Sequence, residues 1–462
     1  MSLTFSDQGV ARSQRAFVRA RGALFLFLGA AVVVVAGWSF LQGPQLRSVS
    51  SGGAEFHERA SSTVVLRSDR AIEPMLPGDI TVTPRADFTV EMEATTLSIT
   101  FTNPLLSDTT YDITANEVTP RGWGRTTQWS AQLRTGTFDF LYLRDVGADV
   151  ELVRASPLAA QEDVIHQAEG ITGFAEVGTV IALLREGDAG PILELLDPPS
   201  GQVERIALPP GFEPRYLAPE SWGTTLVLIA DSINERGGLQ SDSVALMDVL
   251  GDRQPQIVQG LSDEAVSVRS VMVSPLTGDV VLWHKNQDLL RFDPLTGTLL
   301  PLGRAFEVWG FDAAGGSLVY VDGQGTLLYD LVTGDIARVA RGELEGVPVI
   351  HEKMSRTPAG ANVHRVRLPG LSDLPPYYLL TVEEQEGVHT RLTGSLESPE
   401  SIGDLGLSRN GEYALVEVNP QATFLGYPGL TRDQIAQGTV VRLMDVGEGV
   451  LLRQWPGHSF QW

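Results

Sequence analysis

The 462-residue chain contains no cysteine. A disulfide-stapled scaffold, a thiolate zinc site and a cysteine nucleophile are therefore excluded. The chain also lacks a Gly-x-Ser-x-Gly elbow, a phosphate-binding loop and a His-Glu-x-x-His segment. Its seven histidines stand singly along the sequence, and we expect each of them to be structural. The sequence therefore predicts no catalytic residue, no cofactor and no metal site.

Positive charge is scarce as well, with 34 Lys and Arg against 57 Asp and Glu and a net charge of −23. Residues 1–22 hold four arginines and one aspartate, a local charge of +3, so the remainder carries −26 (−23 minus +3). A surface of that sign repels nucleic acid at long range, and we expect no nucleic-acid partner.

One long apolar run is present, at residues 23–41 (ALFLFLGAAVVVVAGWSFL), and it contains no charged residue. A helix of about 20 apolar residues crosses a bilayer, and arginines before it favour a cytoplasmic N-terminus. The pattern predicts a cytoplasmic tail at 1–22, a single transmembrane helix at 23–41 and a polar linker at 42–55. The cell membrane is then one partner, and the bulk of the chain is extracytoplasmic.

Two alternatives for this run are a cleaved signal peptide and a buried core helix. A signal peptide has a shorter apolar stretch with a small-x-small site directly after it, whereas the nearest such site, Ser48-Val49-Ser50, lies well past the apolar end. A core helix in a globular domain has one polar face, whereas this run is apolar all round.

Residues 56–136 consist of short alternating runs separated by turn residues, a pattern typical of a small β-sandwich. Leu97–Phe101 (LSITF) alternates between apolar and polar residues, and Pro77-Gly78 and Asn103-Pro104 are typical turn sequences. The segment 97–115 (LSITFTNPLLSDTTYDITA) resembles bacterial Ig-like domains of the surface-layer type, without their Phe-Thr-Phe-Thr ending. The resemblance implies a spacer or adhesive module in which Tyr111 is a core aromatic residue.

From residue 138 to 462 one pattern recurs, in which an apolar strand ends in Asp and a turn with Gly leads into a second strand. Leu327–Asp330, followed by Thr333-Gly334, is one copy. The recurring aspartates are Asp145, Asp197, Asp248, Asp293, Asp330 and Asp445. Asp bonds its own backbone two residues on and Gly supplies positive φ, so turn geometry explains both residue types.

Each repeat contains about four strands in ~40–50 residues, the period of a β-propeller blade. The segment 274–302 (SPLTGDVVLWHKNQDLLRFDPLTGTLLPL) resembles WD40-like and TolB-like propeller repeats, although the Gly-His and Trp-Asp dipeptides of true WD40 blades are missing. The expected fold class is all-β, with a transmembrane helix, an Ig-like β-sandwich and a propeller of seven blades, or alternatively six. Gly457–Trp462 is expected to close the ring on the first blade.

Two inserts, 351–370 and 419–437, are the expected recognition loops, because loops on a rigid scaffold usually carry binding residues. The first is basic within an acidic chain and gives a candidate partner-binding loop of Lys353, Arg356, Arg365 and Arg367. The sequence thus predicts a membrane-anchored binding or scaffolding protein of the bacterial cell envelope, with a protein or cell-wall partner and no enzymatic activity. The alternative is a carbohydrate hydrolase or lyase with paired carboxylates in the propeller funnel.

Overall fold

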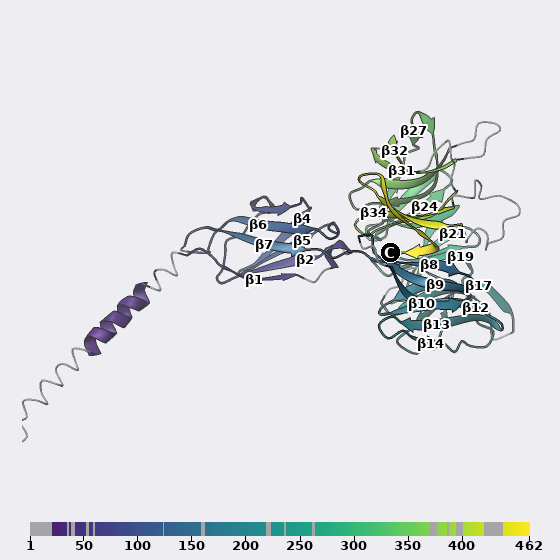
Figure 1. Cartoon of the computed structure of the whole chain (residues 1–462), viewed down its shortest axis with the longest axis horizontal. Coiled ribbons are helices and arrows are strands. Elements are labelled where there is room, and N and C mark those ends of the chain that lie inside the picture. The colour runs from purple at the N-terminus through teal and green to yellow at the C-terminus, as the bar shows by residue number, and fades with distance from the viewer. Residues whose placement is uncertain are drawn as a thin grey trace, which may run out of the picture. The chain divides into compact units, whose positions relative to one another are not determined.

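The computed structural model describes most of the chain in two compact units (Figure 1). The described residues are 21–34, 37, 42–51, 55–58, 61–122, 124–158, 162–218, 223–234, 237–260, 264–368, 377–385, 388–393, 401–419 and 438–462. Unit 1 comprises Met1–Gly53, Ser61–Thr102 and Thr110–Arg134, and unit 2 comprises Ala54–Ala60, Asn103–Thr109 and Thr135–Trp462. Nearly all of the secondary structure is β-strand.

The predicted transmembrane helix at 23–41 is not confirmed. The described helical residues of this region are 21–34 and 37. Among the described residues, none of the helices is long and apolar enough to span a bilayer. The predicted single-pass location in the cell membrane is therefore wrong. The tail residues 1–20 and the remaining span residues 35–36 and 38–41 lie outside the described residues.

Unit 1 contains two antiparallel sheets. The first has the order β1 (Leu46–Ser51), β2 (Thr63–Ser68), β5 (Thr96–Phe101), β4 (Phe88–Glu93), and the second β3 (Ile80–Thr83), β6 (Thr110–Val118), β7 (Thr127–Arg134). Alternate residues of β5 are fully buried, as the period-two pattern requires. Tyr111 of β6 is 1% exposed, so the prediction of a core aromatic residue is confirmed.

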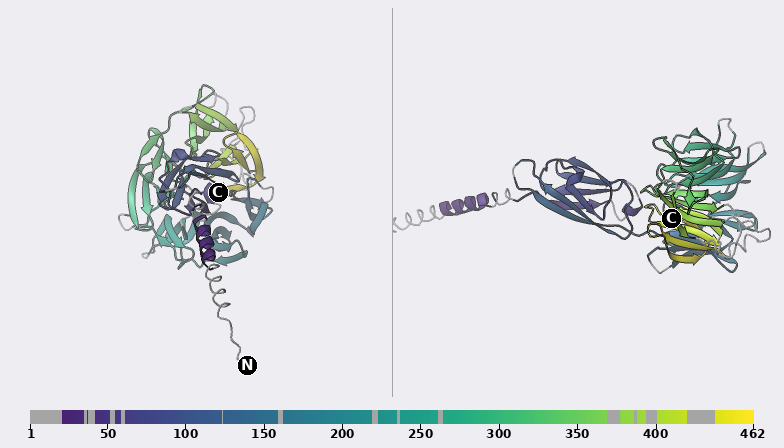
Figure 2. Two further views of the ribbon diagram at one scale, coloured as in Figure 1. Left: turned by 90° about the vertical axis from the view of Figure 1, so that its left-hand side faces the viewer. Right: turned by 90° about the horizontal axis from the view of Figure 1, so that it is seen from above.

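Unit 2 is a β-propeller. Its described residues form seven sheets, antiparallel except for the pairing of β27 with β32, and Figure 2 shows the sheets arranged as a ring. The first sheet contains β8 (Phe140–Val146), β9 (Asp149–Ala155), β10 (Glu162–Glu169) and β37 (His458–Gln461); the second β11 (Ile171–Val177), β12 (Val180–Gly187), β13 (Gly190–Asp197) and β14 (Gln202–Arg205); and the third β15 (Glu213–Leu217), β16 (Thr225–Ile233), β17 (Leu239–Asp248) and β18 (Gln256–Ile257).

The other four sheets follow in chain order. The fourth contains β19 (Val268–Val273), β20 (Val280–His284), β21 (Asp288–Asp293) and β22 (Thr298–Arg304); the fifth β23 (Glu307–Phe311), β24 (Ser317–Asp322), β25 (Gly325–Asp330) and β26 (Ile336–Arg338); and the seventh β33 (Ser401–Leu407), β34 (Tyr413–Asn419), β35 (Val440–Asp445) and β36 (Val450–Pro456). The sixth has the order β28 (Val347–Pro348), β27 (Glu343–Leu344), β32 (Val388–Thr393), β31 (Tyr377–Gln385), β30 (Asn362–Leu368), β29 (Ile350–Arg356).

The ring is closed by β37, which pairs with β8 through His458 opposite Leu143 and Gln461 opposite Leu141. The first sheet therefore combines strands from both ends of the propeller sequence, and the closure predicted from Gly457–Trp462 is confirmed. Around this junction the ring centroid of Phe140 lies 5.7 Å from that of Trp462. Closure covers an edge of β8 that would otherwise present unpaired N–H and C=O groups.

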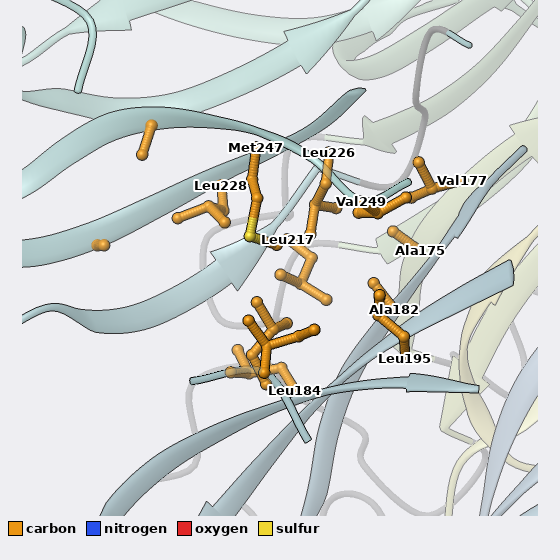
Figure 3. Packing of buried hydrophobic residues seen from close by; sticks show 14 of the residues in the cluster. Ala175, Val177, Ala182, Leu184, Leu195, Leu217, Leu226, Leu228, Met247 and Val249 are labelled. Carbon is orange, nitrogen blue, oxygen red and sulfur yellow. The ribbon is translucent and has the colours of Figure 1, made fainter. Parts of the chain in front are cut away.

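The core of the propeller lies between neighbouring sheets. Between the second and third sheets, Leu184 and Leu195 pack with Leu217, Leu226 and Met247, all less than 6% exposed (Figure 3). Side chains alternate along each strand, so both faces of a sheet are buried against a neighbour. The outermost strands β14 and β26 are instead exposed along their whole length.

Five of the six recurring aspartates, all except Asp145, bind the turns that follow them, as predicted. Oδ1 of Asp293 accepts the backbone N–H of Leu295 at 2.9 Å, and Oδ1 of Asp330 accepts those of Val332 and Thr333, each at 2.8 Å. The glycine that follows has positive φ at Gly201, Gly297, Gly334 and Gly449. Hydrogen bonding within the turn holds the pKa of Asp293 below its usual value, the Thr296 hydroxyl contributing most.

Asp330→Ala should lower the free energy of unfolding by about 1–2 kcal/mol, because two turn N–H groups lose their acceptor. Urea unfolding followed by circular dichroism measures the change. The control is Asp188→Ala in the β12–β13 turn, where the carboxylate makes no hydrogen bond to any described residue. Equal losses in the two variants would contradict the turn role of Asp330.

Candidate functional site

The four predicted partner-binding cations lie on strands of the sixth sheet. Lys353 and Arg356 belong to β29, and Arg365 and Arg367 to β30. The two strands pair with Lys353 opposite Arg365, so the predicted loop 351–370 is largely a β-hairpin. Charged residues occupy one face of this hairpin, so its strands lack the apolar runs by which a strand is usually predicted from sequence. The second predicted loop, 419–437, lies outside the described residues apart from residue 419.

Each of the four cations has a partner within the sixth and seventh sheets. Lys353 forms an ion pair with Asp404 of β33, and Arg367 pairs with Glu352 at 2.5 Å. The guanidinium of Arg365 donates to the carbonyls of Ile402 at 3.3 Å and Gly403 at 2.6 Å. Arg356 donates to the side-chain oxygen of Asn362 at 3.0 Å. These residues therefore connect sheets and strands, and much of their charge is balanced inside the blade.

The innermost strands of the seven sheets share one irregularity that could not be predicted from the sequence. These strands are β11, β15, β19, β23, β29, β33 and β37. In all seven of these strands the register with the next strand shifts near the start of the strand. The residues passed over are Thr172, Arg215, Arg269, Trp309, Glu352, the pair Gly403 and Asp404, and the pair Ser459 and Phe460. A β-bulge turns a side chain away from the regular pleat and is frequent beside binding sites.

Two neighbouring bulges carry arginine and line a pocket between the third and fourth sheets. The pocket has a volume of about 630 Å³, within the range of small-ligand sites. Its polar lining comes from Arg215, Tyr216, Asp242, Arg269 and Lys285, with the apolar side chains of Ile229 and Val268. The three cations are exposed, in a chain whose net charge is −23.

The pocket cations are held in place by local contacts. Arg269 lies over the Trp283 ring, 5.2 Å from its centroid, and donates to the carbonyl oxygen of Lys285 at 3.0 Å. Lys285 pairs with Asp242 at 2.7 Å, and Arg215 pairs with Asp231 of β16. Side chains fixed in this way lose little further conformational freedom when a ligand binds.

Two carboxylates lie on the strands of the seventh sheet. Desolvation would raise the pKa of Asp404, but the Lys353 ammonium outweighs it and holds that pKa below the usual value. Burial, followed by the Asp404 charge, raises the pKa of Glu417 on β34. Desolvation, followed by the charge of Asp404, raises the pKa of Tyr216 to about 12.

Sequence analysis also missed a cluster of histidines. His351, His364 and His389 come together on the sixth sheet, with candidate metal-ligating atoms all within 4.8 Å of one another. Their positions in the sequence are 13 and 25 residues apart, spacings that match no helix-borne metal motif. The available signal was indirect, since polar residues such as Thr381 and Glu383 occupy strand positions that a blade core fills with apolar side chains.

No known protein family matches the chain by sequence, and no curated protein matches it. Solved structures with a similar arrangement include dihydro-heme d1 dehydrogenase NirN in complex with DHE, with 13% identity over 70% of this chain and 74% of that one and a TM-score of 0.40. The Cps50 (Swd1) beta-propeller domain from Myceliophthora thermophila has 13% identity over 63% and 89%, with a TM-score of 0.37. A nidogen/laminin complex has 12% identity over 70% and 94%, with a TM-score of 0.36. Likeness at this level carries no information on ligand or activity.

Arg365→Ala should destabilise the protein more than Arg367→Ala. Arg365 bridges to two backbone carbonyls of the neighbouring sheet, and hydrogen bonds from a charged group contribute about 1.5–3 kcal/mol. Arg367 makes a partly exposed ion pair, which contributes roughly 0–1 kcal/mol. Thermal unfolding of both variants distinguishes the two cases. A larger drop in melting temperature for Arg367→Ala would show that Arg365 does not connect the sixth and seventh sheets.

Proposed function

We propose that this protein is a non-enzymatic binding or scaffolding protein whose propeller engages an acidic partner at the pocket between the third and fourth sheets. The observation that carries the proposal is the convergence of Arg215, Arg269 and Lys285 on one pocket in a strongly acidic chain. Positive side chains on rigid strands in an otherwise acidic protein favour a ligand that carries carboxylate or phosphate groups.

The architecture supports a scaffold. The propeller is one closed ring of seven blades, with the repeat pattern of WD40-like and TolB-like proteins. In unit 1 the strand orders β1-β2-β5-β4 and β3-β6-β7 correspond to the two sheets of a constant-type immunoglobulin sandwich, and we infer an Ig-like spacer. Neither inference assigns a catalytic group.

Binding of an acidic probe tests the pocket. The wild-type chain should bind a fluorescein-labelled hexaglutamate peptide, with an affinity that falls as salt is raised, because exposed charges are screened. Arg269→Ala combined with Lys285→Ala should weaken binding at least about tenfold, the effect of losing ~1.4 kcal/mol of interaction. Fluorescence anisotropy measures the affinity of each variant.

The matched control removes two positive charges away from the pocket. Arg253 follows β17, and Arg205 ends β14, the outermost strand of the second sheet; neither lines the pocket. Arg253→Ala with Arg205→Ala changes the net charge equally and should leave the affinity unchanged. Equal weakening in both double variants, or no binding by the wild-type chain at low salt, would contradict the pocket proposal.

A second candidate is a carbohydrate hydrolase or lyase, favoured by the opposite pKa shifts of Asp404 and Glu417. Such a pair can provide one ionised carboxylate and one protonated acid. Both groups are engaged within the chain, however, since Asp404 pairs with Lys353 and Glu417 accepts the backbone N–H of Ser459. Turnover of polysaccharides by the purified chain, abolished in a folded Glu417→Gln variant, would establish this candidate in place of the binding protein.

A further inference from the structure

The histidine cluster lies on one face of the sixth sheet. His351 belongs to β29, His364 to β30 and His389 to β32, and the ring centroids are 4.2 Å (351–364), 4.8 Å (364–389) and 5.3 Å (351–389) apart. Strand alternation places these rings on the face opposite Lys353 and Arg365. The cluster is therefore separate from the cations that join the sixth and seventh sheets.

Hydrogen bonds occupy one nitrogen of each of two rings and leave the other nitrogen for the cluster. His364 Nε2 lies 2.9 Å from Oε2 of Glu383, and a carboxylate oxygen can only accept, so the Nε2–H donates. The lone pair of this fully buried ring is then on Nδ1, which has no hydrogen-bond partner. His389 Nδ1 lies 2.9 Å from the hydroxyl of Thr381, which leaves Nε2 for the cluster.

The third ring completes the set. Nε2 of His351 lies 3.4 Å from Nε2 of His389. Two nitrogens bound to one tetrahedral zinc ion at 2.0–2.1 Å are about 3.3 Å apart, so the separation of these atoms already fits a shared ion. Burial lowers the pKa of His351 to about 3 and that of His389 to about 4, and it lowers the pKa of His364 too. Neutral imidazoles are the form that binds a metal.

We propose that His351, His364 and His389 form a binding site for a divalent transition-metal ion of the zinc type. Three imidazole nitrogens without sulfur match the protein ligands of such ions. A buried Nδ1 without a partner is destabilising in the absence of a ligand, and a metal ion would satisfy it. The ion would join three strands of one blade, since the ligands come from β29, β30 and β32.

Glu383 and Thr381 act as outer partners of this site. Each fixes one ring orientation from β31, the strand between the β30 and β32 ligands. Glu383 is 4% exposed and also accepts the side-chain N–H of Asn362 at 3.0 Å, which holds its carboxylate toward His364. A carboxylate behind a ligating histidine sets the tautomer and makes the free nitrogen a better ligand.

Gly342 leaves the space that the cluster needs. A Cβ at this position would clash with Nε2 of His389, the atom assigned to the metal, and the three atoms nearest to it all belong to the His389 ring. The backbone of Gly342 does not require positive φ, so its conformation is open to alanine. Gly342→Ala therefore offers a way to block the site without removing a ligand.

The test is titration of the metal-free, full-length chain with Co²⁺ and Zn²⁺ after dialysis against a chelator. The wild-type chain should bind one equivalent of Zn²⁺ by calorimetry, show the visible absorption of tetrahedral Co²⁺, and gain melting temperature with either ion. His351→Ala and Gly342→Ala should each weaken Zn²⁺ binding about 100-fold. His284→Ala, which removes a histidine outside the cluster in the fourth sheet, should bind as the wild type does.

Circular dichroism confirms that each variant is folded before binding is compared. The proposal is overturned by the absence of tetrahedral Co²⁺ absorption in the wild-type chain, or by undiminished Zn²⁺ binding in folded His351→Ala. Loss of binding in His284→Ala to the same extent as in His351→Ala would likewise place the ion elsewhere. None of these results depends on the acidic probe, so the metal site is tested independently of the pocket between the third and fourth sheets.

Discussion

The pairing of β37 with β8 is the interaction on which the rest of the propeller depends. It is the only described hydrogen-bonded ladder that joins the two ends of the propeller sequence within one sheet. Phe140, Trp455 and Trp462 pack around it, with ring centroids of Trp455 and Trp462 5.1 Å and 5.7 Å from that of Phe140. Aromatic burial at the junction therefore reinforces the hydrogen bonds, and each blade gains a neighbour on both faces.

With the ring closed, the inner strands are fixed relative to one another, and their shared bulges become useful. The same backbone irregularity presents arginine in the third and fourth sheets, tryptophan in the fifth and glutamate in the sixth. The repeated blade structure thus places a bulge at the same position in each blade, and the residue type at that position differs between blades. The sixth sheet departs furthest from the pattern, because it adds the hairpin β27–β28 beyond β32 and contains the buried histidines.

Local features could be predicted from the sequence. The Asp and Gly turns, the alternation in Leu97–Phe101 and the change to a repeating pattern near residue 138 depend on neighbours a few residues away. The hairpin of β29 and β30 was taken for a loop because strands with charge on one face look irregular in sequence.

The candidate sites could not be predicted, because their geometry is non-local. The pocket between the third and fourth sheets requires Arg215 and Lys285 to be neighbours, although 70 positions separate them. The histidine cluster depends on the order of four strands and on a register shift between His351 and Lys353. A displacement of one residue in β29, β30 or β32 would turn the imidazole of that strand to the opposite face.

The wide separation of β8 and β37 also has a consequence for synthesis. More than 300 residues are translated between Phe140 and His458, which takes roughly 15–60 s at ~5–20 residues per second. For that interval β8, β9 and β10 exist on the ribosome without the strand that belongs beside them, while later blades emerge and fold. An unpaired β8 can accept any passing extended segment, including one from a neighbouring nascent chain on the same messenger. Pairing of β8 with β37 of the same chain therefore competes with pairing to strands of other chains. Slow translation or closely spaced ribosomes would increase the fraction of mispaired chains.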